Sequence, residues 1–172
     1  VCLMKYSLWQ SGVRWLWLAP LVIVLDQLSK LAILHYLPYG GPGINVLPVF
    51  NIVHVYNKGA AFSFLADQAG WQRWFFALFA IGVSLVMLVA LRRQAASLWW
   101  SNCAFVLVIG GAIGNLIDRI AYGHVVDFLL FYWQTYTFPA FNIADCAITV
   151  GAVMIVLEGL FKKPASQSES AS

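Results

Sequence analysis

Charged residues are scarce in this chain of 172 residues: Asp, Glu, Lys and Arg together make up 10% of it, against roughly 25% in soluble domains. Hydrophobic residues make up 62%. This balance excludes an ordinary soluble domain and predicts an integral membrane protein. The length leaves room for about four spans of about 20 residues each, so we expect one domain over residues 1–172 and no separate soluble unit.

Cysteine is also scarce. The chain has three cysteines, Cys2, Cys103 and Cys146, in no metal-binding or paired spacing, so the sequence predicts no disulfide framework. The net charge of +3 indicates no nucleic-acid partner, because the basic residues lie at the ends of apolar stretches. There they set the topology and contact anionic headgroups, so membrane lipids are the expected surroundings.

Four apolar stretches are long enough to cross a bilayer core of about 30 Å. They cover approximately residues 13–37, 71–91, 98–117 and 141–161. The first is longer than the apolar core of a signal peptide and is followed by no small-residue cleavage site, so we expect it to be retained. The predicted fold is therefore all-α within the membrane, with four transmembrane helices.

The basic residues predict the orientation. One side has Lys5, Arg14, Arg92, Arg93, Lys162 and Lys163, and the other has Lys58, Arg73 and Arg119. This excess places both termini in the cytoplasm. Residues 38–70 then form the longer outward-facing connection, in which Phe50–Tyr56 (FNIVHVY) has the composition of a short strand. We expect a small outward-facing β element over about residues 38–70 and a disordered polar tail over about residues 164–172.

Acidic and amide side chains in or beside the apolar stretches are the strongest functional signal. They are Asp26, Asn115, Asp118, Asp127, Asn142, Asp145 and, as an outlier, Glu158. An ionisable group at membrane depth costs several kcal/mol unless it faces a cavity or a partner. Each of these positions is therefore a candidate for a functional site.

Two predicted helical faces repeat the same polar spacing. Asp26 and Lys30 are four residues apart, and so are Asn115 and Arg119, with Asp118 between them in GGAIGNLIDRI. Such pairs share a helix face, and the glycines allow a neighbouring helix to come close. The spacing of Asp26 and Lys30 leaves two interpretations open: a functional pair, or a structural one in which Lys30 pairs internally or extends to the interface.

Asp127 and Asp145 are the remaining candidate acids. Taken alone, Asp127 in HVVDFLLFYW is typical of a surface acid capping a short interfacial helix, and Asp145 of a simple helix cap. The predicted topology, however, gathers Asp26, Asp118, Asp127 and Asp145 near one outward face. Two carboxylates in one pocket do not both ionise cheaply, so one holds a proton while the other accepts a proton from water. Aspartic peptide hydrolysis has this requirement.

Motifs of other hydrolases are absent from the sequence, which has no HExxH and no GxSxG. Two functions outside hydrolysis stay open: a small ion- or proton-coupled transporter, and a non-catalytic scaffold that binds lipoproteins. A transporter is disfavoured because the sequence has no internal repeat and the acids gather at one face. A scaffold would tolerate Asp to Asn changes, whereas an aspartic enzyme would not.

Five segments carry a family resemblance: DQLSK, YNKGAAFS, GGAIGNLIDRI, VVDF and PAFNIADCAITVG, in this order from about Trp15 to Glu158. They closely resemble the bacterial lipoprotein signal peptidase family, signal peptidase II. The resemblance implies a four-helix inner-membrane aspartic endopeptidase with a small periplasmic β-cradle and a short interfacial helix. It implies cleavage of diacylglyceryl-modified prolipoproteins on the N-terminal side of the lipidated cysteine, no metal or cofactor, and inhibition by globomycin-type peptide antibiotics.

The same resemblance implies roles for individual residues. Asp127 and Asp145 would form the catalytic dyad, and either of them can be the general base. The supporting positions would be Asp26, Lys30, Asn57, Gly59, Ala60, Asn115, Asp118, Arg119, Asn142 and Ala144. Their polar groups are expected to orient the acids and the substrate backbone. Arg119 and Asn57 are expected to donate hydrogen bonds to substrate carbonyls.

Overall fold

The computed structural model describes residues 5–59 and 71–161, so Ala60 and the polar tail lie outside the described residues. Within that part of the chain, four helices are long and apolar enough to cross a membrane. They are α1 (Leu18–Tyr36), α2 (Trp71–Arg93), α3 (Trp99–Tyr122) and α4 (Ile143–Phe161). The four predicted spans are confirmed. The first differs in detail, because a 3-10 helix, η1 (Gly12–Trp17), precedes α1.

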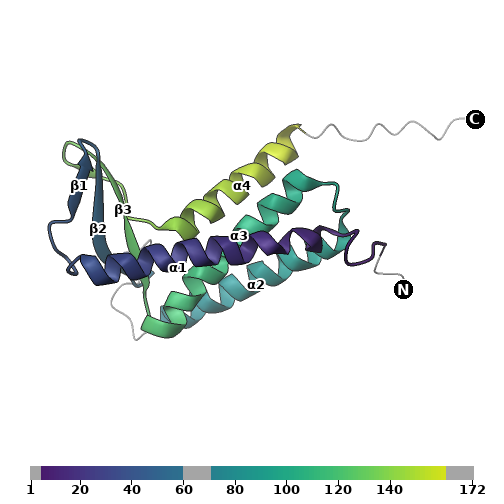
Figure 1. Cartoon of the computed structure of the whole chain (residues 1–172), viewed down its shortest axis with the longest axis horizontal. Coiled ribbons are helices and arrows are strands. Elements are labelled where there is room, and N and C mark those ends of the chain that lie inside the picture. The colour runs from purple at the N-terminus through teal and green to yellow at the C-terminus, as the bar shows by residue number, and fades with distance from the viewer. Residues whose placement is uncertain (1–4, 60–70, 162–172) are drawn as a thin grey trace, which may run out of the picture.

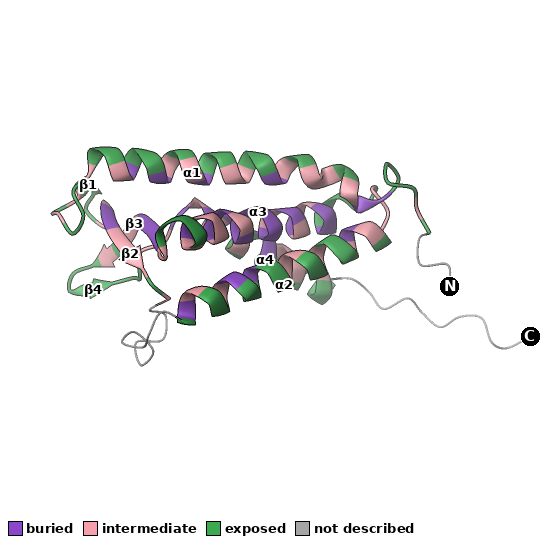
Figure 2. Cartoon of the chain, turned by 90° about the horizontal axis from the view of Figure 1, so that it is seen from below, coloured by how far each residue is buried: buried purple, intermediate pink, exposed green. Residues whose placement is uncertain are grey.

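The helices pack lengthwise around α3, which contacts the other three (Figures 1 and 2). In its most apolar segment 56% of α3 is buried, compared with at most 28% in the other spans. Small residues allow this close packing. A β-carbon on Gly110 would lie 2.9 Å from the Val22 side chain of α1, and one on Gly111 would collide with the Ala144 carbonyl of α4. The GGAIG segment therefore brings both neighbouring helices against α3.

A four-stranded antiparallel sheet of order β1-β2-β3-β4 covers one end of the bundle (Figure 1). Its strands are β1 (Ile44–Leu47), β2 (Phe50–Asn57), β3 (Val125–Trp133) and β4 (Tyr136–Thr137). The β element predicted in the outward connection is confirmed by β1 and β2. The other two strands come from the segment between α3 and α4, which the sequence analysis had not assigned to the sheet.

The interpretation of the Asp127 segment as an interfacial helix is wrong. Gly123 ends α3 in the left-handed conformation (φ +79), and the chain then pairs with β2, placing Asp127 opposite Val55. The segment is rich in Val, aromatic and Leu residues, and such side chains fit a half-buried pleated surface. At this end of the bundle the structure describes no helix within residues 37–59 or 123–142, and residues 60–70 lie outside it.

The opposite end of the bundle holds η1, the connection from α2 to α3, and the end of α4 (Figure 1). Hydrogen bonds join η1 to that connection: Gly12 N donates to the Gln94 carbonyl (2.9 Å) and Trp15 Nε1 to the Ala96 carbonyl (2.9 Å). Arg92 and Arg93 end α2 there as well. Of the basic residues predicted to share one side of the membrane with the termini, those that the structure describes therefore lie at one end, away from the sheet; Lys162 and Lys163 lie outside the described residues.

We expect Gly111→Ala to lower the free energy of unfolding in detergent by about 1–3 kcal/mol, because the added methyl overpacks the contact between α3 and α4. Gly82→Ala is the matched control, since nothing lies within 4 Å of a β-carbon at that position. There the same change removes backbone freedom from the unfolded chain and leaves stability equal or higher by up to about 1 kcal/mol. Thermal or denaturant unfolding of both variants checks this; equal losses would contradict the packing.

Candidate functional site

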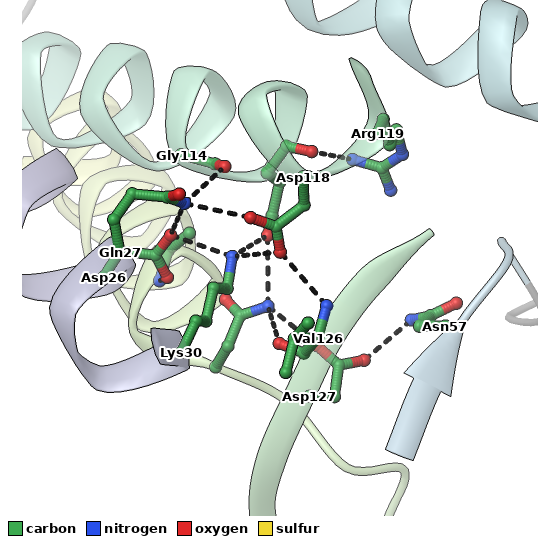
Figure 3. Close-up of polar contacts among 12 residues, drawn as sticks. Asp26, Gln27, Lys30, Asn57, Gly114, Asp118, Arg119, Val126 and Asp127 are labelled. Carbon is green, nitrogen blue, oxygen red and sulfur yellow. Dashed lines mark hydrogen bonds and ion pairs between the residues drawn. The ribbon is translucent and has the colours of Figure 1, made fainter. Parts of the chain in front are cut away.

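A buried ion cluster joins α1 to α3 (Figure 3). Lys30 Nζ lies 2.8 Å from Asp26 Oδ2, one turn earlier in α1, and 2.9 Å from Asp118 Oδ2 in α3. The three side chains are at most 3% exposed. Lys30 is thus an internal partner of both acids and does not extend to the membrane interface.

Gln27 completes this cluster and was not among the predicted site residues. Its Nε2 donates to Asp26 Oδ2 (3.1 Å), to Asp118 Oδ1 (2.9 Å) and to the Gly114 carbonyl (3.2 Å). The amide therefore supplies donors between two carboxylates that share one ammonium group (Figure 3). The available signal was a second polar residue beside Asp26 within an otherwise apolar span.

The ion cluster also fixes two backbone segments outside it. Asp118 Oδ2 accepts a hydrogen bond from Val126 N (3.0 Å), and Asp26 Oδ1 accepts one from Ala144 N (2.9 Å). Val126 directly precedes Asp127, and Ala144 directly precedes Asp145. The carboxylates of α1 and α3 therefore set the positions of β3 and of the start of α4, the two elements that carry Asp127 and Asp145.

Two asparagines connect Asp127 to Asp145. Asn142 donates from Nδ2 to Asp127 Oδ1 (2.7 Å) and from its backbone N to Asp145 Oδ2 (3.2 Å). Asn115 Nδ2 donates to Asp145 Oδ1 (2.7 Å). Asn115 Oδ1 accepts hydrogen bonds from Asn142 Nδ2 (3.0 Å) and Lys30 Nζ (3.0 Å). The prediction that the four acids gather in one polar region is confirmed, because this network includes all of them.

Asp145 has a second role at the start of α4. Asn142 Oδ1 accepts a hydrogen bond from Asp145 N (2.9 Å), while Asp145 Oδ2 accepts one from Asn142 N. This reciprocal pair is a capping box in which Asn142 is the cap. Asp145 does more than complete this capping box, because its other carboxylate oxygen, Oδ1, accepts the hydrogen bond from Asn115 in α3.

Asp127 lies in the interior, with 1% of the residue exposed. Asn57 Nδ2 of β2 donates to its Oδ2 (2.9 Å), opposite the bond from Asn142 to Oδ1. Burial, followed by the negative charge of Asp145, raises the pKa of Asp127 to about 7, while the donors Asn57 and Asn142 and the charge of Lys30 oppose the rise. Asp127 is therefore about half protonated near neutral pH and mostly protonated below it.

Gly59 and Arg119 lie against Phe76 of α2, another residue that the sequence analysis missed. Gly59 has φ +100 and donates its N–H to Asn57 Oδ1 (2.8 Å), and a β-carbon there would lie 2.5 Å from the Phe76 ring. The Arg119 guanidinium lies 5.2 Å from the centre of the same ring, and its Nη1 donates to the Asn115 carbonyl (3.2 Å). Phe76 thus supports the outer edge of the network.

Two clefts adjoin Asp145. The first, called the three-helix cleft, lies between α2, α3 and α4, holds about 200 Å³, and is lined by residues that include Phe76, Val83, Asn115, Arg119, Asp145 and Ile148. The second, called the α4 cleft, holds about 500 Å³ and is lined by residues that include Phe138, Ala140, Phe141, Asp145, Cys146, Thr149 and Val150. Asp145 therefore lies where two mainly apolar spaces meet, and such a site can hold an amphiphilic chain.

The structure brings together the predicted site residues that it describes. Those in direct contact with one another are Asp26, Lys30, Asn57, Gly59, Asn115, Asp118, Arg119, Asp127, Asn142, Ala144 and Asp145. Glu158 is separate: it accepts a hydrogen bond from Ser101 Oγ (2.5 Å), more than three helical turns from Asp145 along α4. The outlier of the sequence analysis thus lies outside this network.

Comparison with known proteins gives one family. A family model described as signal peptidase (SPase) II matches residues 18–161. A lipoprotein signal peptidase of Aeromonas hydrophila is 60% identical, covering 87% of this chain and 90% of the relative, and one of Vibrio cholerae is 52% identical, covering 95% and 96%. A solved bacterial membrane enzyme superposes with a TM-score of 0.77 at 29% identity, covering 98% of both chains, and a second with 0.78 at 30%.

We expect Lys30→Met to lower the free energy of unfolding by about 3–5 kcal/mol, because two buried carboxylates lose their ammonium partner. Arg93→Met, at an exposed position at the end of α2, is the control and changes it by at most about 0.5 kcal/mol. Adding Asp26→Asn and Asp118→Asn to Lys30→Met removes the unpaired charges and recovers much of the loss. Unfolding in detergent micelles compares these three variants with the wild type. If the triple variant recovers no stability, Lys30 acts through its size and not through its charge.

Proposed function

This chain belongs to the signal peptidase II family, and we propose that Asp127 and Asp145 are the two catalytic acids of this intramembrane aspartic endopeptidase. The observation that carries the proposal is Asn142, which donates to both carboxylates, through Nδ2 to Asp127 and through its backbone N to Asp145. Shared donors of this kind hold two acids in a fixed relation on either side of one reacting group. The transporter and scaffold alternatives have no comparable support.

The proposed substrates are prolipoproteins with a diacylglyceryl-modified cysteine, cut on the N-terminal side of that cysteine. The names of the relatives support this substrate class, and the two clefts beside Asp145 suit a substrate that is part peptide and part lipid. Inhibition by globomycin-type peptide antibiotics stays a prediction of the resemblance.

The proposed location is the bacterial inner membrane, with both termini in the cytoplasm and the sheet on the periplasmic side. This orientation rests on the basic residues at the end away from the sheet, which include Lys5, Arg14, Arg92 and Arg93. Positive charge is retained on the cytoplasmic side of membrane proteins. The acids then lie near the outer surface, where exported precursors arrive.

In the proposed reaction Asp145 is the general base and Asp127 the acid. The raised pKa of Asp127 lets it carry a proton near neutral pH. Asp145 lies in the first turn of α4 and accepts hydrogen bonds from Asn115 Nδ2 and Asn142 N, and both this position and these bonds favour its ionised form. Asp145 takes a proton from water, and the water oxygen attacks the scissile carbonyl carbon, whose oxygen accepts a hydrogen bond from Asp127. When the C–N bond breaks, Asp127 gives its proton to the leaving amine, and the proton on Asp145 restores the one-proton pair.

Arg119 and Asn57 are proposed to bind substrate carbonyls. Arg119 lines the three-helix cleft with Asp145, and its guanidinium is held by Phe76 and the Asn115 carbonyl. Arginine has five N–H donors, so a group anchored through one of them still presents others to a peptide. Asn57 contacts Asp127 from the strand that borders the site. Both donors would hold an extended peptide in register with the acids.

We expect Asp127→Asn and Asp145→Asn each to reduce kcat about 10²–10⁴-fold or more on a purified diacylglyceryl-prolipoprotein in detergent, because the amide keeps the shape and loses the transferable proton or the base. Glu158→Gln is the matched control, since it is the same kind of change outside the network, and it retains wild-type activity. Thermal unfolding shows that each variant is folded. Near-normal turnover in either aspartate variant would remove that residue from the catalytic pair.

The pH dependence of kcat/KM follows from the pKa of Asp127. Above pH about 7 both acids are ionised, so kcat/KM falls on the alkaline side with an apparent pKa near 7. The Asn57 donor favours the Asp127 carboxylate and lowers its pKa, so Asn57→Ala raises the pKa and moves the alkaline limb to higher pH.

The matched control for this profile is Asn45→Ala, which removes an asparagine of β1 that bonds the Tyr132 hydroxyl. In the Asn45→Ala variant, the alkaline limb of the kcat/KM profile stays at the wild-type pH. A limb that is unmoved in Asn57→Ala, or that moves to lower pH, contradicts the assignment of the proton to Asp127.

A further inference from the structure

We propose that the α4 cleft seats one acyl chain of the substrate, next to the scissile bond. This inference rests on the proposed function, because it takes the lipidated cysteine as the residue that follows the cut. The occupant is a saturated or unsaturated hydrocarbon chain joined through glycerol to the cysteine sulfur.

The first argument is position. Asp145 lines both the three-helix cleft and the α4 cleft, so a peptide bond placed at Asp145 has one of these spaces on each side. The residue after the cut carries the lipid on its own side chain. Its hydrocarbon chains therefore start within a few bonds of Asp145 and enter one of the two clefts.

The second argument is the chemistry of the cleft walls. The three-helix cleft contains the Arg119 guanidinium and the Asn115 amide beside Asp145, and such groups bind the N–H and C=O groups of a peptide. Apart from Asp145, the described lining of the α4 cleft has only apolar side chains, the Cys146 thiol and the Thr149 hydroxyl. A hydrocarbon chain needs no polar partner. The peptide therefore fits the first cleft and the acyl chain the second.

The third argument is the path beyond the cleft. Val150 and Val153 are each 50% exposed and Leu157 is 37% exposed, and their spacing puts them on one face of α4. A chain of 16 carbons that enters at Asp145 passes Val150, about 7.5 Å deeper in the helix, and continues along this face into the bilayer. Because the bilayer is as apolar as the cleft, seating contributes orientation and not hydrophobic free energy.

The test uses Val150→Trp, which fills the deep end of the α4 cleft at an exposed position where the fold tolerates a large side chain. Substrates are one prolipoprotein peptide carrying dipalmitoylglyceryl or diacetylglyceryl on the cysteine. The diacetyl substrate lacks the long hydrocarbon chain that would run past Val150, whereas the palmitoyl chains extend well beyond it. The control is Val89→Trp, the same change at a 48% exposed residue of α2 that lines neither cleft.

We expect Val150→Trp to lower kcat/KM about tenfold or more for the dipalmitoyl substrate and less than twofold for the diacetyl substrate, while Val89→Trp changes neither. Equal losses on both substrates, or no loss on either, overturn the proposal. The Asp127→Asn and Asp145→Asn variants distinguish failure of this proposal from failure of the proposed function. Their loss of activity tests the two acids and does not depend on the length of the acyl chain.

A second measurement maps the chain directly. The Asp145→Asn protein, mixed with a prolipoprotein whose acyl chain carries a diazirine, is irradiated and digested. Crosslinks within residues 146–153 of α4 support the proposal. Crosslinks confined to α2, on the other wall of the three-helix cleft, overturn it.

Discussion

The buried contact of Lys30 with Asp26 and Asp118 is the interaction on which the rest of the site depends. A buried ion cluster is a poor source of stability, because desolvation of the charges offsets most of their attraction, and apolar replacements are often neutral or better. What this cluster provides is geometry. Its carboxylates accept hydrogen bonds from Val126 N and Ala144 N, so one charged centre sets the backbone immediately before Asp127 and before Asp145.

The two acids differ because different kinds of secondary structure carry them. Asp127 is on a strand inside the protein, where burial opposes ionisation and two side-chain amides are its donors. Asp145 is in the first turn of a helix, with a backbone N–H and an Asn115 amide as donors. This contrast supports the proposal that Asp127 is the acid and Asp145 the base. A shared asparagine then keeps them in a single network.

Hydropathy, local spacing and the resemblance predicted much of this protein. The four spans follow from long apolar stretches, and the Asp26–Lys30 pair follows from a spacing of four on one helix face. The β3 strand could not be found from spacing because its partner β2 lies about 70 residues earlier, and strand pairing at that distance leaves no local periodicity. Gln27 and Phe76 were missed for a related reason, since their contacts cross between helices.

The central claim is that the acids share one proton, held on Asp127. Difference infrared spectroscopy of the carboxyl stretch, recorded on the detergent-solubilised enzyme between pH 4 and 9, measures this directly. The account predicts a protonated carboxyl band that disappears in wild type with a midpoint near pH 7 and is absent from folded Asp127→Asn protein. A band that disappears near pH 4, the ordinary range of an exposed aspartate, or that persists in the Asp127→Asn protein would contradict it.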